Sequence, residues 1–312
     1  MSPGVTEGAV VVAVQASISA TPHHGAVLAD VGGEPALALV LRRLAPLPGL
    51  TGAELAVVTT DGPADDAIAA VAEAHDVRLV RGPVDDPLKG LAITMVRLDA
   101  QTMVRVDADG PFADPFVVQA ALTLHQSGTA DHTSNLLPRT YPRGLDVEVF
   151  SKRALGACEL EITDSSERRD PGAFVRRHPQ RFRLATVLSG HGLAAERWVI
   201  DSSADLIRVR EIAGQVPDIG TASWNRILAV AGRAAKPRPG ELRLEPEHTS
   251  EPGAYPWVCR WSVVVDGARR GTAVTTTADG QVRHDVDVPD EWREPARAAL
   301  YQLLHGDADG RS

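Results

Sequence analysis

The feature that most limits the possible folds is the alternation of strand-like and helix-like segments up to about residue 213. Residues 9–15 (AVVVAVQ) form an uninterrupted, mostly β-branched run, which is typical of a strand buried on both faces of a parallel sheet. The alternation continues with strands predicted at 54–60, 77–82 and 102–106, and with helices at 35–44, 65–75 and 87–98. This βαβαβαβ order predicts an α/β fold with a doubly wound, mostly parallel, Rossmann-like sheet.

Beyond this unit the pattern is less regular. Residues 236–256 are rich in Pro, Glu and Gly and are predicted to be a connector. We therefore divide the chain into an α/β domain over 1–213 and a C-terminal α+β extension of unknown role over 214–312. The remaining predicted elements are helices at 115–125, 152–159, 167–177, 203–213 and 291–304, strands at 144–150, 181–187 and 197–200, and three strands over 257–289.

The composition argues against several classes of protein. There are 32 Lys and Arg residues against 41 Asp and Glu, and this net charge of −9 argues against a nucleic-acid binder, which needs a basic surface. Cys158 and Cys259 are far apart and belong to no Cys/His cluster, so we expect buried thiols. The apolar run near the N-terminus is shorter than the roughly 20 residues of a membrane span, and a soluble, cytoplasmic protein is expected.

Ligands of doubly wound sheets bind beyond the carboxyl ends of the strands. The loops after Gln15 and after Val106 are therefore where the chemistry is expected. The second of these loops begins DADG and supplies Asp107 and Asp109. Carboxylate oxygens are hard ligands that suit Mg²⁺.

The order of several motifs resembles a known family. Residues 134–155 (SNLLPRTYPRGLDVEVFSKRAL), 104–115 (VRVDADGPFADP) and 197–212 (RWVIDSSADLIRVREI) closely resemble segments of the cytidylyltransferase family of spore-coat polysaccharide biosynthesis protein F. That family is related to the CMP-sialic acid and CMP-Kdo synthetases. The resemblance covers about residues 9–213. It implies a nucleotide-diphospho-sugar transferase-like fold, with residues 1–213 as the nucleotide-binding domain.

The resemblance also implies an activity and a set of site residues. The family joins CMP from CTP to an acidic sugar or similar anionic acceptor, using Mg²⁺, and the resemblance suggests a homodimer. The positions that match the metal and catalytic carboxylates are Asp109 and Asp201, with Asp107 as a possible third metal ligand. The matching nucleotide-binding positions are Gln15, Ala16, Ser17, Gly25 and Asp86, and the matching acceptor-binding positions are Arg139, Tyr141, Asp146 and Glu148.

The first loop departs from the family pattern. Where the family has Q-A-R-M-G-S-T-R-L-P-G-K, this chain reads QASISATPHHGA over residues 15–26, and no Lys or Arg occurs before Arg42. Losing charge-assisted contacts to a triphosphate, at about 1.5 to 3 kcal/mol each, would weaken nucleotide binding severely. An arginine from elsewhere would have to replace them, and the candidates are Arg105, Arg139 and Arg168. Arg139 and Arg143 are also candidate anion-binding residues, with surface solvation as the alternative.

Two other functions therefore stay open. The Asp107 and Asp109 pair forms a DxD motif similar to that of metal-dependent glycosyltransferases of related fold, whose nucleotide-sugar donors need fewer cations. Alternatively, the chain is a catalytically degenerate family member that binds a ligand or a partner protein.

Overall fold

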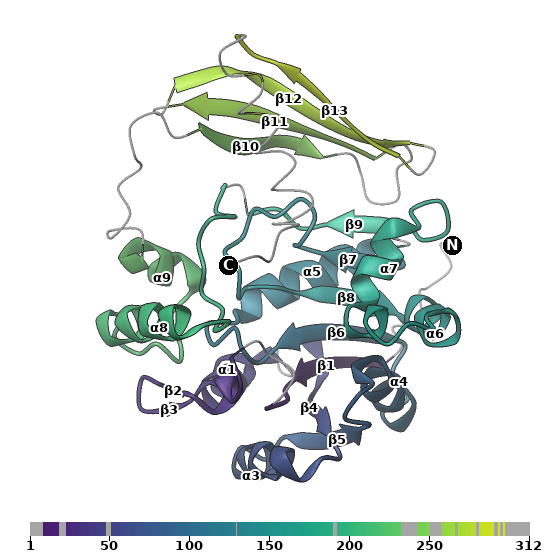
Figure 1. Ribbon diagram of the computed structural model, residues 1–312, viewed down its shortest axis with the longest axis vertical. Coiled ribbons are helices and arrows are strands. Elements are labelled where there is room, and N and C mark those ends of the chain that lie inside the picture. The colour runs from purple at the N-terminus through teal and green to yellow at the C-terminus, as the bar shows by residue number, and fades with distance from the viewer. Residues whose placement is uncertain are drawn as a thin grey trace.

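The fold was analysed in a computed structural model, which describes residues 9–18, 23–47, 51–128, 130–189, 192–231, 242–249, 257–265, 268–278, 281–289, 293 and 296. Its centre is a seven-stranded sheet with the order β5-β4-β1-β6-β8-β7-β9, shown in Figure 1. A four-stranded sheet, β10-β11-β12-β13, and a two-stranded sheet, β2-β3, complete the β-structure of this part of the chain.

The first four long strands of the central sheet are parallel. β1 (Val10–Gln15) lies between β4 (Glu54–Thr60) and β6 (Thr102–Asp107), and β5 (Arg78–Gly82) pairs with β4. The other half is mixed, because β8 (Glu148–Ser151) runs antiparallel to β6 and to β7 (His132–Ser134), while β9 (Leu184–Thr186) is parallel to β7. The predicted α/β fold with a mostly parallel sheet is confirmed.

Helices cover both faces of this sheet, because the strands are apolar on both sides. In β1, Val10, Val12 and Val14 face one hydrophobic cluster, whereas Val11 and Ala13 face another. The first cluster contains residues of α1 (Ala36–Leu44), α3 (Asp66–Ala74), α5 (Pro115–Ser127), α8 (Ser203–Gln215) and α9 (Trp224–Ala231). The second contains residues of α4 (Pro87–Arg97), α6 (Lys152–Glu161) and α7 (Pro171–Arg177).

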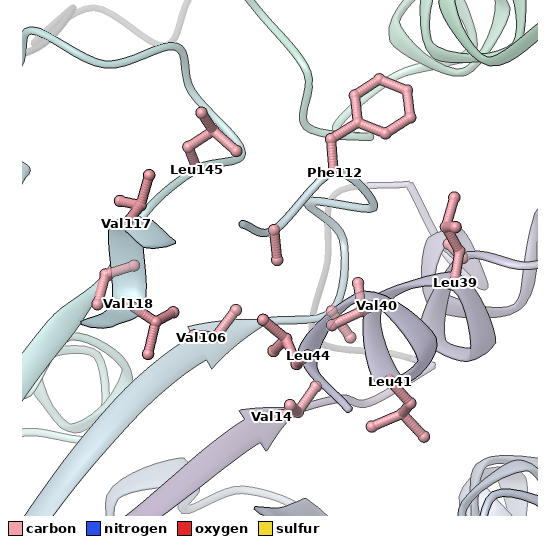
Figure 2. Close-up of a cluster of buried hydrophobic side chains, with 14 of the residues drawn as sticks. Val14, Leu39, Val40, Leu41, Leu44, Val106, Phe112, Val117, Val118 and Leu145 are labelled. Atoms are coloured by element: carbon pink, nitrogen blue, oxygen red, sulfur yellow. The ribbon is translucent and has the colours of Figure 1, made fainter. Parts of the chain in front are cut away.

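Figure 2 shows part of the first cluster around the carboxyl ends of β1 and β6. Val14 and Val106 project from the two strands toward Leu44 of α1, and Val117 and Val118 of α5 lie beyond Val106. All five side chains are buried. The strand ends that precede the candidate site are therefore held in a packed apolar layer.

Several predicted elements differ from the structure. The predicted strand 144–150 begins only at Glu148, because Gly144 has φ 98° and directs the backbone away from the sheet. The predicted strand 197–200 is one isolated bridge between Arg143 and Arg197. The predicted helix 167–177 is interrupted, since Asp170 and Pro171 end the short 3-10 helix Glu167–Arg169 and start α7.

The C-terminal sheet is an antiparallel meander. The three predicted strands are present as β11 (Trp257–Val265), β12 (Ala268–Ala278) and β13 (Gln281–Asp287). The prediction of a connector over 236–256 is wrong in part, because β10 (Leu242–Thr249) pairs with β11 despite its internal proline, at which the register shifts. Most of the predicted helix 291–304 lies outside the described residues.

The remaining short elements in the described ranges are η1 (Ala26–Leu28), β2 (Asp30–Val31), β3 (Glu34–Pro35) and η2 (Pro63–Asp65). No helix in these ranges is long and apolar enough to cross a membrane. Cys158 in α6 is a buried free thiol, and burial raises its pKa to about 12. It is therefore protonated and unreactive at neutral pH.

The buried guanidinium of Arg43 joins the segment after α8 to the first helix. Arg43 of α1 donates to the backbone oxygens of Ala113, Ile219 and Ala222, and its guanidinium lies 3.6 Å from Asp114. The Asp114 carboxylate also accepts a hydrogen bond from the Trp224 backbone N–H at 2.8 Å. Burial lowers the pKa of Arg43 to about 10, so the guanidinium remains charged at neutral pH. The division of the chain at residue 213 stays a prediction, but residues 216–231 share the core of the part before them.

His125 gives a first testable prediction, which concerns stability against pH. Its ring is buried in α5, 3.0 Å from the Thr133 hydroxyl, and burial lowers its pKa from 6.5 to about 4. Between pH 6.5 and 4 the unfolded state binds a proton that the folded state does not, so the folded state loses stability as the pH falls through this window. The loss is about 3 kcal/mol for a shift of this size. Urea unfolding at a series of pH values should show that the free energy of unfolding falls less steeply with decreasing pH in His125→Asn than in the wild type. Equal slopes would contradict the prediction.

Candidate functional site

A cavity of about 200 Å³ opens at the carboxyl end of β6. Three chain segments surround it: residues 107–110 after β6, residues 142–146 before β8, and residues 197–201 before α8. Four carboxylates and one guanidinium therefore share a small space. The lining residues are Asp107, Asp109, Arg143, Gly144, Asp146, Val199 and Asp201.

Backbone contacts hold the three segments together. The Ile200 N–H donates to the Asp109 carbonyl oxygen at 2.9 Å, and the Trp198 N–H donates to the Arg143 carbonyl oxygen at 2.7 Å. A side chain at Gly144 would place its Cβ 2.5 Å from the Trp198 carbonyl oxygen, and a Cβ at Gly110 would collide with the Gly144 backbone. The two glycines allow the close backbone approach that brings the carboxylates to one cavity.

Most charges of the cavity are already paired. Two charged lining side chains are exceptions: within the described residues, neither Asp109 nor Arg143 forms a side-chain ion pair or hydrogen bond. The other three carboxylates each form an ion pair with an arginine, namely Asp107 with Arg105 at 3.1 Å, Asp201 with Arg197 at 2.9 Å, and Asp146 with Arg139.

Burial raises the pKa of Asp109 well above its ordinary value, and the negative charges of Asp107, Asp201 and Asp146 raise it further. A bound divalent cation would remove this repulsion. No three His, Cys, Asp or Glu side chains in the described ranges are close enough to hold an ion by themselves. Mg²⁺, however, is often held by one or two carboxylates together with substrate phosphates. Asp109 and Asp201 fit that donor set, whereas both oxygens of Asp107 accept from Arg105.

The residues predicted to bind nucleotide lie near the end of β1, with one exception. Gln15 pairs in register with Asp107, and its side-chain Oε1 is buried with no hydrogen-bond partner among the described residues. The Ala16 N–H already donates to Val58, and Ser17 is buried. Gly25 is left-handed at φ 78° and closes the loop by donating to Ile18. Between them, residues 19–22 lie outside the described part of the chain.

Asp86 is the exception and lies apart from the cavity lining. It caps α4 by accepting from the Lys89 N–H at 3.0 Å and forms an ion pair with Arg168 at 2.8 Å. Burial alone would raise the pKa of Asp86, but its hydrogen bonds and the positive charges of Arg168 and Lys89 lower it. The geometry therefore gives Asp86 a helix-capping position, and a nucleotide-binding role for it stays a prediction.

The residues predicted to bind the acceptor do not all reach the cavity. Asp146 lines it, and Arg139 lies beside it in the ion pair with Asp146. Tyr141 belongs to the hydrophobic core, where its ring packs 5.3 Å from Trp224 and burial raises the pKa of its hydroxyl. Glu148 is also buried, away from the lining.

Glu148 is the centre of a buried charged cluster. Its carboxylate accepts from Arg176 at 2.5 Å, from His132 at 3.1 Å and from Arg105 at 3.2 Å. Burial alone would raise the pKa of Glu148, but the surrounding positive charges and hydrogen bonds lower it far below its ordinary value. Because Arg105 also binds Asp107, this cluster fixes the position of one cavity carboxylate.

None of the three arginines proposed to replace the missing loop cations is available. Arg105 is bound by Asp107 and Glu148, Arg139 by Asp146, and Arg168 by Asp86 and Glu159. Arg143, the other candidate anion-binding arginine, was not among the predicted acceptor-binding residues, yet it lines the cavity itself. It precedes Gly144, whose backbone packs closely against residues 198 and 199 and so holds this segment at the cavity.

The central sheet and its helices form a nucleotide-diphospho-sugar transferase-like fold. A cytidylyltransferase from Leptospira borgpetersenii serovar Hardjo-bovis (strain JB197) has a similar structure, with a TM-score of 0.68 and 20% identity, over 72% of this chain and 94% of that one.

Among curated proteins, the spore coat polysaccharide biosynthesis protein SpsF of Bacillus subtilis (strain 168) is 21% identical over 223 residues, which cover 69% of this chain and 92% of that protein. No family model matches the chain. The similarity to SpsF confirms the resemblance found in the sequence motifs.

Proposed function

We propose that this chain is a nucleotidyltransferase that transfers CMP from CTP to an acidic sugar or a similar small anionic acceptor and releases pyrophosphate. The observation that carries the proposal is the cavity lined by Asp107, Asp109, Asp146 and Asp201, in a relative of SpsF. Such a cavity suits a substrate whose charge is carried by phosphates and neutralised by a metal ion.

The cavity residues would have the following roles. Asp109 and Asp201 would hold Mg²⁺, which neutralises phosphate charge when it is bound. Asp107 and Asp146, each paired with an arginine, would shape the walls of the cavity without adding unpaired charge. The buried Oε1 of Gln15 would accept a hydrogen bond from a donor group of the nucleotide.

The reaction would then be a direct displacement. The acceptor hydroxyl oxygen attacks the α-phosphorus in line and releases its proton to solvent, and the bond between that phosphorus and the pyrophosphate oxygen breaks, so pyrophosphate leaves and no covalent enzyme intermediate forms. The chain contributes mainly by holding the two substrates in line and by balancing charge. Arg139, Tyr141, Asp146 and Glu148 are proposed for the acceptor side, with Asp146 alone of these lining the cavity itself.

A calorimetric titration tests the proposal. CTP, the other nucleoside triphosphates and nucleotide-sugars are titrated into the protein with Mg²⁺ or with EDTA, and pyrophosphate release is assayed with a panel of sugar acids. We expect CTP to bind only with the metal and to give pyrophosphate with at least one acceptor. CTP binding that needs no metal and survives Asp109→Ala would contradict the proposed mechanism.

A catalytically degenerate binding protein is the second candidate. It is favoured by the absence of any Lys or Arg before Arg42, together with the pairing of Arg42 by Glu34. Failure of the folded protein to bind any nucleotide would select this candidate. A glycosyltransferase is less supported, because Arg105 occupies both oxygens of Asp107 in the DxD pair. Tight binding of a nucleotide-sugar in the same titration would favour it instead.

A further inference from the structure

The cavity contains one carboxylate, Asp109, and one guanidinium, Arg143, that have no ion-pair partner among the described residues. Asp107, Asp146 and Asp201 each form an ion pair with an arginine outside the cavity lining. Asp109 and Arg143 line the same small cavity, yet in the described part of the chain they form no ion pair with each other or with other residues. Charged groups in such a partly enclosed space are normally paired, because leaving them unpaired costs stability.

A purely structural role does not account for Arg143. If the guanidinium stabilised the fold, four carboxylates would be available around the same cavity to pair with it. Its backbone already performs the structural task, since the Arg143 N–H donates to Glu196 at 2.9 Å and its carbonyl accepts from Trp198 at 2.7 Å. The Arg143 guanidinium is therefore available to bind a ligand.

The two unpaired charges match one kind of ligand. A phosphate group bound to a divalent cation presents the cation to a carboxylate and its own oxygens to a guanidinium, whose planar fork suits phosphate. Asp109 and Arg143 offer these two groups within one cavity of about 200 Å³.

We propose that Arg143 binds a phosphate group of the metal-bound nucleotide and so replaces the cations missing from residues 15–26. Phosphate is then held by the segment 142–146 that lines the cavity, and not by side chains of the loop after β1. This inference rests on the proposed function for the nature of the ligand. It adds the residue that recognises the phosphate.

Binding experiments with two probes test the inference. Pyrophosphate and CTP, each with Mg²⁺, are titrated into wild-type protein and into Arg143→Gln, and Mn²⁺ alone is titrated with detection by electron paramagnetic resonance. Arg143→Gln should weaken binding of pyrophosphate and CTP about ten- to a hundredfold, the range for one lost charge-assisted contact. It should leave Mn²⁺ binding unchanged or slightly tighter, because only a positive charge is removed.

Two variants control for fold and net charge. Arg143→Lys keeps the charge without the planar fork and should give intermediate affinity. Arg97→Gln removes the same charge from an exposed position in the last turn of α4 and should bind like the wild type. Thermal unfolding of Arg143→Gln should match the wild type, since the backbone contacts of Arg143 remain.

The outcomes separate this inference from the proposed function. If CTP is turned over and Arg143→Gln binds pyrophosphate as tightly as the wild type, the inference is overturned and the function stands. If pyrophosphate binds through Arg143 but CTP is never turned over, the inference stands and the function fails. Absence of both pyrophosphate and CTP binding by the wild type overturns both.

Discussion

Replacement of Asp109 by Asn is expected to lower the rate of pyrophosphate release by about a hundred- to a thousandfold, the range seen when one electrostatic contact to a transition state is removed. The reason is that Asp109 is the cavity carboxylate without an arginine partner among the described residues. The same substitution should leave the metal-free protein as stable as the wild type or more stable. Burial and three neighbouring carboxylates disfavour the charge of Asp109, and Asn removes that charge.

The measurement combines a pyrophosphate assay with thermal unfolding in EDTA. Asp99→Asn is a matched control, because Asp99 precedes the opposite end of the same strand, β6, with its side chain 94% exposed. Its left-handed backbone, at φ 44°, also tolerates Asn. The control should keep full activity. A loss of stability in Asp109→Asn with little loss of rate would mean that Asp109 is a structural residue, and it would refute the catalytic role.

The sequence predicted the central sheet well because its signal is local. The strands at 54–60, 77–82 and 102–106 are short segments in which Val, Leu or Met side chains recur, although arginines interrupt two of them, and such a segment between helix-like segments is enough to indicate a strand. The short elements were missed because they carry no such local signal. β7 (His132–Ser134) is a three-residue polar segment that is buried only because β8 and β9 flank it, and this environment is a tertiary property.

The distinction between local sequence signals and tertiary environment also applies to the candidate site. The cavity carboxylates Asp107, Asp109, Asp146 and Asp201 were selected from strand ends and motif matches, and the structure places all four around one cavity. Sequence alone could not tell which charges are already neutralised. Arg105, Arg139 and Arg168 were plausible anion ligands until their ion pairs were known. The pairing of charges depends on side-chain positions that no local pattern encodes.

The largest effect on stability is expected from Glu148→Gln, which should lower the free energy of unfolding by about 3 to 5 kcal/mol, the cost of breaking a buried ion pair by removing one partner. Glu148 is 4% exposed and accepts hydrogen bonds from Arg105, His132 and Arg176. Gln keeps the size of the side chain, but its amide group turns N–H donors toward donors. It also removes the buried negative charge between the two arginines, which keep only Asp107 and Asp170 as partners. Urea unfolding with an unchanged m-value would measure the loss.

The dependence on pH distinguishes this charge effect from a packing effect. Because the folded pKa of Glu148 is lowered, its contribution is complete above the ordinary glutamate pKa of about 4.3 and is lost as the pH falls below it. The difference between Glu148→Gln and the wild type should therefore be constant from pH 5 to 7, at about the size given above, and should shrink below about pH 4. Glu54→Gln, which removes an exposed partner of Arg78, should cost no more than about 1 kcal/mol. A Glu148→Gln deficit that stayed the same in acid would show that packing, and not the buried charge, is the origin of the loss.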